Sequence, residues 1–122
     1  MISNRKESFR YEFPEKIPAL FTIKQIDDKD VTTASGEAEI VNISLQGIRF
    51  RTKLDIPKVN EKKIHLHISF KLNEKQFQLL GKIVWKRNKY PENEYGMQLF
   101  TNETEQMELL QHLKIYARKK QV

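Results

Sequence analysis

The sequence predicts a mainly β fold, either a closed antiparallel barrel or a small sandwich, followed by one C-terminal α-helix. Six short stretches alternate apolar with polar residues and are separated by turn residues, as expected of strands with one buried face. After Phe100 the apolar period lengthens from two to about 3.6 residues, which is typical of an amphipathic helix. The chain has 122 residues, which is enough for one domain with a single core.

The composition is that of a soluble globular protein, with 39% hydrophobic and 31% charged residues. No apolar run is long enough to span a membrane and the start lacks the apolar core of a signal peptide, so we expect a cytoplasmic protein. The lack of cysteine excludes disulfides and thiolate chemistry. The net charge of +6 predicts attraction to phosphates of a nucleotide, a nucleic acid or an anionic lipid. Basic residues near both ends of the chain could instead serve only solubility.

The first elements are an irregular segment and three strands. Residues 1–17 are polar and contain Pro14 near their end, which predicts a basic N-terminal arm rather than a regular element. Alternation then predicts a strand over 18–26, a charged loop over 27–35, and strands on both sides of a turn, over 36–43 and 48–51. We therefore place the start of the barrel at residue 18 and its end at residue 100.

Three further strands are predicted over 64–72, 75–87 and 94–100. The clearest is 64–72, where every second residue is apolar, and Asn73-Glu74 predicts a hairpin turn after it. Gly81 inside the next strand predicts a bulge or a bend. The helix is predicted over 101–122, starting at an Asn102-Glu105 capping box. Its apolar stripe comprises Met107, Leu109, Leu110, Leu113, Tyr116 and Ala117.

A candidate binding turn lies between two of the predicted strands, where the sequence reads Asn42-Ile-Ser44-Leu-Gln-Gly47. Asn42 and Ser44 are short side chains that bond readily to nearby backbone, and Gly47 can adopt the positive φ of a tight turn. Taken alone, the pattern is more often an ordinary capped turn than a ligand site.

A basic cluster upstream, Arg5-Lys6-Glu-Ser-Phe-Arg10, gives that turn a partner. Together the two stretches resemble the PilZ domain, a bacterial receptor for the second messenger cyclic di-GMP. Trp85 and the run Tyr-Gly-Met-Gln-Leu-Phe over 95–100 extend the resemblance to residues 5–100. The resemblance implies a six-stranded antiparallel β-barrel rather than a sandwich.

The resemblance also implies the ligand, cyclic di-GMP, and its site, formed by Arg5, Lys6, Arg10, Asn42, Ser44 and Gly47. An arginine can fork onto a phosphate or onto the O6 and N7 atoms of guanine. Lys6 stands where the family has its first arginine and lacks that planar fork, unless Arg5 substitutes. The Asn42 amide and Ser44 hydroxyl would bond guanine, and Gly47 would leave room for the base. Binding would pull the arm that carries Arg10 onto the barrel and change the surface shown to an unidentified partner protein.

Other functions remain open at this stage. A module of the same fold that has lost the ligand and only docks to proteins is the first alternative. Binding of single-stranded nucleic acid is the second, although the aromatics mostly fall on inward-facing positions. The basic last helix could also bind a membrane surface.

An enzyme is not predicted, and neither is a metal or cofactor. His65 and His67 lie on one face of a strand, but the third histidine, His112, lies on the helix and gives no convincing third ligand. The sequence has no glycine-rich phosphate loop, and Ser44 has no evident base.

Overall fold

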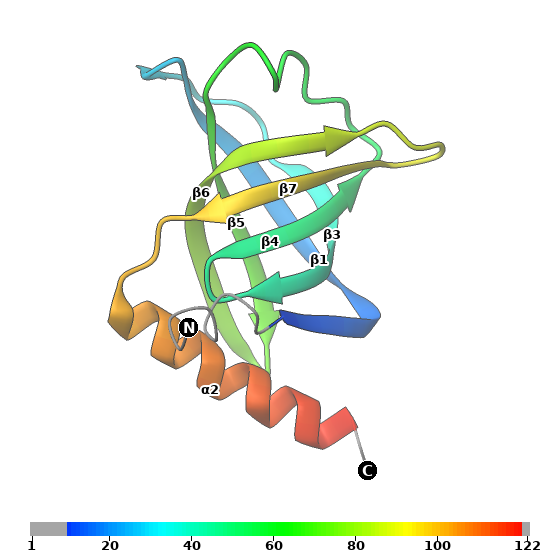
Figure 1. The fold of residues 1–122 in the computed structure, drawn as a ribbon, viewed down its shortest axis with the longest axis vertical. Helices are drawn as coiled ribbons and strands as arrows, with labels where there is room; N and C mark the ends of the chain where they lie inside the picture. The colour runs from blue at the N-terminus through cyan, green and yellow to red at the C-terminus, as the bar shows by residue number, and fades with distance from the viewer. Residues whose placement is uncertain (1–9, 121–122) are drawn as a thin grey trace, which may run out of the picture.

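The computed structural model describes residues 10–120, which form a β-barrel with a helix at one end (Figure 1). Its strands and helix have the following bounds: β1 Arg10–Ile26, β2 Lys29–Asp30, β3 Gly36–Ser44, β4 Gly47–Thr52, β5 Ile64–Leu72, β6 Lys75–Arg87, β7 Asn93–Leu99 and α2 Glu103–Lys120. No helix within this range is long and apolar enough to cross a membrane.

The sheet closes on itself through its first strand. The strand order is β2-β1-β3-β4-β7-β6-β5, every described pair is antiparallel, and β1 also pairs with β5. The predicted six-stranded barrel is therefore confirmed. The two-residue β2 only extends the end of β1, across a turn in which Asp27 and Asp28 have φ angles of 52° and 68°.

The first strand starts at Arg10, earlier than the predicted residue 18. Phe13 and Ile17 both face the core, while the pairing of β1 with β3 shifts register between Glu12 and Ile17. This irregularity accommodates Pro14, which has no backbone N–H to donate, and it breaks the alternation that would have marked the strand. Arg10 therefore lies on the sheet and not on an arm in front of it. Arg5 and Lys6 lie outside the described residues.

The core fills the inside of the barrel. The alternation predicted for 64–72 is confirmed, because Ile64, Leu66, Ile68, Phe70 and Leu72 are all buried. On the opposite wall Tyr95 stacks on Phe50 at a centroid distance of 5.3 Å. The Tyr95 hydroxyl accepts a hydrogen bond from the Ile56 N–H at 2.7 Å, so its one polar atom is satisfied.

Of the bulge or bend predicted at Gly81, the bulge lies at another position in β6. Gly81 pairs in regular register with both neighbouring strands, and the shift between β6 and β7 falls between Ile83 and Trp85. Gly81 is needed because β7 passes close by, so that a Cβ atom would collide with the carbonyl oxygen of Gln98.

The helix covers one end of the barrel and begins at the predicted capping box. The Glu105 N–H donates to Asn102 Oδ1 at 2.8 Å, and the Asn102 N–H donates to Glu105 Oε1 at 3.0 Å. Leu109 and Leu113 are fully buried against the barrel. Met107 does not belong to the stripe, since it is 72% exposed. It precedes Leu109 by two residues, which at about 100° per residue puts it on the far side of the helix.

Candidate functional site

The turn between β3 and β4 holds its own polar groups in place. The Ser44 Oγ accepts a hydrogen bond from the Gln46 N–H at 3.3 Å and donates to the Gly47 carbonyl at 3.4 Å. Gly47 does not have the positive φ that we predicted. A glycine is favoured there by close packing, since a Cβ atom would lie 3.2 Å from the Met97 carbonyl oxygen on β7. The turn is thus a compact corner with β7 packed beneath it.

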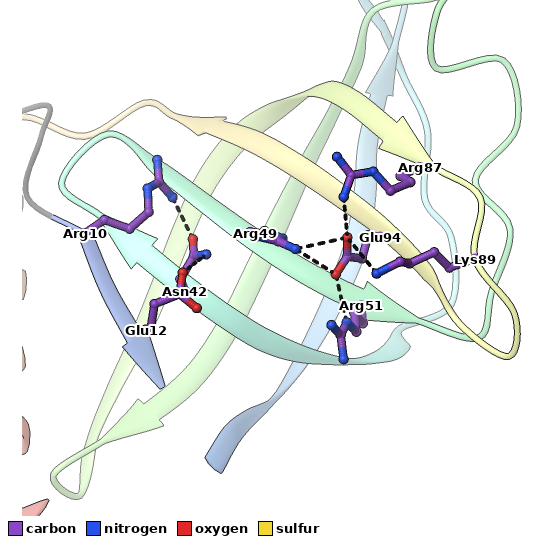
Figure 2. A network of polar contacts seen from close by, with 8 residues as sticks. All are labelled: Arg10, Glu12, Asn42, Arg49, Arg51, Arg87, Lys89 and Glu94. Carbon is purple, nitrogen blue, oxygen red and sulfur yellow. Dashed lines mark hydrogen bonds and ion pairs between the residues drawn. The ribbon is translucent and has the colours of Figure 1, made fainter. Parts of the chain in front are cut away.

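Arg10 meets this corner across the β1–β3 pair. The register places Arg10 opposite Ser44 and Glu12 opposite Asn42. Arg10 Nη1 donates to Asn42 Oδ1 at 2.6 Å, and Asn42 Nδ2 donates to Glu12 Oε2 at 2.7 Å (Figure 2). Four of the six predicted site residues, Arg10, Asn42, Ser44 and Gly47, therefore come together. The other two, Arg5 and Lys6, lie outside the described residues.

The corner opens into a groove of about 590 Å³ on the outside of the barrel. Five strands contribute to its lining: β1, β3, β4, β6 and β7. Its volume is within the range typical of sites for small molecules. The lining also includes residues that the predicted site lacked, among them Glu12, Arg49 and Trp85.

Trp85 reaches the groove because of the irregularity in β6. The pairing of β6 with β7 shifts register between Ile83 and Trp85, which places Trp85 opposite Gly96. The Trp85 side chain remains 36% exposed. A Cβ atom at position 96 would collide with the indole ring, so the glycine gives the ring its place. The sequence marks Trp85 as part of a family pattern, but only the pairing of β6 with β7 places it beside Arg49 in the same groove.

A buried carboxylate gathers cations next to the groove. Glu94 is fully buried, Arg51 Nε donates to it at 2.9 Å, and Arg49 Nη2 donates at 3.2 and 3.3 Å. Arg87 Nη1 and Lys89 Nζ lie 3.6 and 3.9 Å from the same carboxylate (Figure 2). Burial by itself raises the pKa of Glu94, but the hydrogen bonds from Arg51 and Arg49 outweigh it and hold the pKa below its ordinary value.

The cluster therefore carries excess positive charge, because four cations surround one ionised carboxylate. Arg49 connects the cluster to the groove, since it both contacts Glu94 and lines the groove. Its Nε atom is buried and has no hydrogen-bond partner among residues 10–120, which is an unfavourable state for a charged donor. The rest of the Arg49 side chain is more accessible, with 32% of its surface exposed, so the groove can attract an anion.

A second groove lies elsewhere on the described surface, away from the predicted site. A larger groove of about 950 Å³ is lined by Leu20 and Leu54 together with side chains of both charge signs, and it includes none of the predicted site residues. Among residues 10–120 no group of three or more histidine and carboxylate side chains could hold a metal ion. His65 and His67 lie half-buried on β5.

Comparison with known families identifies the domain. The family model described as "PilZ domain" matches residues 4–115. The chain belongs to the PilZ domain family. Proteins of this family are generally cyclic di-GMP receptors and not enzymes. The predicted family is confirmed, and Arg10, Asn42, Ser44 and Gly47 all lie within the matched range.

Solved structures show the same fold. A crystal structure of the PilZ domain of CeSA from a cellulose synthesizing bacterium is similar to this chain with a TM-score of 0.59 and 13% sequence identity. The similarity covers 93% of this chain and 99% of that one. No curated protein matches the sequence. At this identity the structural match supports the architecture of the PilZ domain and not the details of its site.

Proposed function

We propose that this PilZ domain binds cyclic di-GMP in the groove at the β3–β4 corner and relays the binding to a partner protein. The observation that carries the proposal is the hydrogen bond between Arg10 and Asn42, which are 32 residues apart in the chain. It joins the two halves of the family's sequence pattern at one groove. The cytoplasm remains the predicted compartment.

Each part of the groove suits a part of a cyclic dinucleotide. The exposed Arg10 guanidinium can fork onto a phosphate or onto a guanine edge. Arg49 adds a second, partly exposed cation to the groove. Trp85 presents an indole on which a base can stack, and such stacking contributes about 1–3 kcal/mol per base. Ser44 and Gly47 keep the corner compact beneath the ligand.

The relay differs from the movement that the sequence suggested. Arg10 lies on β1 opposite Ser44, so binding does not need to recruit it from a distant arm. Arg5 and Lys6 lie outside the described residues and remain proposed contacts of the phosphates. The bound ligand would change the surface that an unidentified partner recognises.

Titration calorimetry with purified protein tests the proposal. We expect heat from cyclic di-GMP and none from GTP or single-stranded DNA. Arg10→Ala should weaken binding by about 10- to 100-fold, because it removes a charge-assisted contact. Ser44→Ala should weaken it less, by about tenfold or below, since Ser44 acts through the shape of the turn.

The matched control is Lys24→Ala, which removes an exposed cation from the same strand but outside the groove. Its affinity should equal that of the wild type. Equal weakening by Arg10→Ala and Lys24→Ala would mean that only net charge matters. Absence of binding by the wild-type protein would contradict the proposed function.

A PilZ module without ligand is the second candidate, and one observation favours it. Asn42 and Ser44 are only 2% and 3% exposed, and both are already hydrogen-bonded within the protein. In that case the corner would be structural and the groove would contact a protein. The same titration separates the two functions, because only the receptor would release heat with cyclic di-GMP.

A further inference from the structure

Asn42 is nearly buried, so another side chain must contact the guanine bases of the proposed ligand. Both ends of its amide are used inside the protein, with Oδ1 accepting from Arg10 and Nδ2 donating to Glu12. Only 2% of Asn42 is exposed, whereas Arg10 and Glu12 are both exposed and line the groove. The two side chains that Asn42 holds are therefore more accessible to a ligand than Asn42 itself.

Glu12 is an unusual residue for a groove that attracts anions. Its carboxylate lies on the same face of β1 as Arg10, and like charge repels the phosphates of a dinucleotide. Among residues 10–120, Glu12 forms no ion pair, and its side chain accepts one hydrogen bond, from Asn42. A carboxylate has two oxygens with about four acceptor positions, so residues 10–120 use only a small part of its capacity. Its place is explained if it accepts hydrogen bonds from the ligand.

Guanine is the base that offers such donors. Its Watson–Crick edge carries N1–H and an N2 amino group side by side, which match the two oxygens of a carboxylate. Adenine presents an unprotonated N1 beside its N6 amino group, so a carboxylate meets one donor and one repelling lone pair. A glutamate at this position therefore favours guanine and disfavours adenine.

We propose that Glu12 selects guanine over adenine in the bound dinucleotide, and that Asn42 is a positioning residue that holds Glu12 and Arg10 in place. This inference rests on the proposed function and adds to it the source of base specificity. Arg10 then serves the phosphate or the O6 and N7 edge, while Glu12 serves the N1 and N2 edge.

The test compares cyclic di-GMP with cyclic di-AMP by calorimetry on the wild-type protein and on Glu12→Gln and Glu12→Ala. For the wild type we expect much tighter binding of cyclic di-GMP. Glu12→Gln should lower cyclic di-GMP affinity by about 10- to 100-fold, the range for one bidentate base contact. It should also strengthen cyclic di-AMP binding, because a Gln amide offers adenine one donor and one acceptor. Glu12→Ala should lose the preference for cyclic di-GMP without binding cyclic di-AMP more tightly.

Two controls separate base reading from structural damage. Glu39→Gln removes an exposed carboxylate from β3 outside the groove and should leave the selectivity unchanged. The side-chain amide resonances of Asn42 show by NMR whether Glu12→Gln keeps the amide in place, as we expect.

The outcomes distinguish this inference from the proposed function. An unchanged ratio of the two affinities in Glu12→Gln, with wild-type binding intact, would overturn only the inference. Tighter cyclic di-GMP binding by Glu12→Ala would also overturn it, because Glu12 would then compete with the ligand for Asn42. If the wild-type protein binds neither dinucleotide, the proposed function fails and the inference fails with it.

Discussion

Glu94 illustrates how one residue organises the charge around the groove. Its carboxylate is buried, yet hydrogen bonds from Arg51 and Arg49 hold its pKa below the ordinary value of 4.5. A carboxylate with a lowered pKa in the folded state stabilises the protein above its unfolded pKa, and this contribution is lost as the pH falls through the folded value. The stabilisation that Glu94 gives to β4 and β7 is therefore lost in acid.

We predict that Glu94→Gln lowers the free energy of unfolding at pH 7 by about 1–3 kcal/mol, because the arginines lose their anionic partner. Below pH 4.5 the wild type should lose stability more steeply than the variant as Glu94 becomes protonated. Urea unfolding across a pH series measures both effects. Glu61→Gln, at an exposed position, is the control and should follow the wild type. Equal stability of Glu94→Gln and wild type at pH 7 would contradict this role.

The residues of the candidate site were predictable only in part. Arg10, Asn42, Ser44 and Gly47 follow from a family resemblance, and the structure places them together. Arg49 needed the pairing of β4 with β3 and β7, since nothing nearby in the chain marks it. Glu12 and Trp85 likewise depend on the irregular registers of β1 and β6. Their ligand contacts remain predictions.

At the scale of elements, turns could be predicted from their own residues, whereas irregular strand pairing could not. The Asn73-Glu74 turn was predicted from its residues, and its φ angles of 55° and 67° are those of a tight hairpin. The start of β1 was missed, because the register shift after Glu12 and the proline within the strand remove the alternation. Such shifts depend on the partner strand and leave little trace in one segment.

The terminal helix packs on the barrel through a narrow strip, which gives an element-scale prediction. Leu113→Ala should lower the free energy of unfolding by about 2–4 kcal/mol, because it opens a cavity at a fully buried site. Met107→Ala should change it by less than about 0.5 kcal/mol, since that side chain is 72% exposed. Urea unfolding of the two variants measures the contrast. Equal losses would mean that the helix packs on the barrel through another face.

At the scale of the whole molecule, barrel closure assembles the groove from distant segments. The residues lining it extend from Arg10 to Gln98 and come from five strands. The positive charge is arranged at this scale too. The composition allowed the excess to lie at the chain ends, but four cations gather around Glu94 beside the groove. Near the C-terminus, Lys120 is paired with Glu15 at 3.3 Å.

The groove at the β3–β4 corner of the PilZ barrel is the proposed binding site of cyclic di-GMP. The most direct test is a two-dimensional ¹H–¹⁵N NMR titration of the labelled protein with cyclic di-GMP. We predict that the largest shifts fall on Arg10, Glu12, the 42–49 corner and the Trp85 indole, with small shifts around Leu20 and Leu54 in the other groove. Shifts centred on that other groove, or no shifts at saturating nucleotide, would contradict the claim.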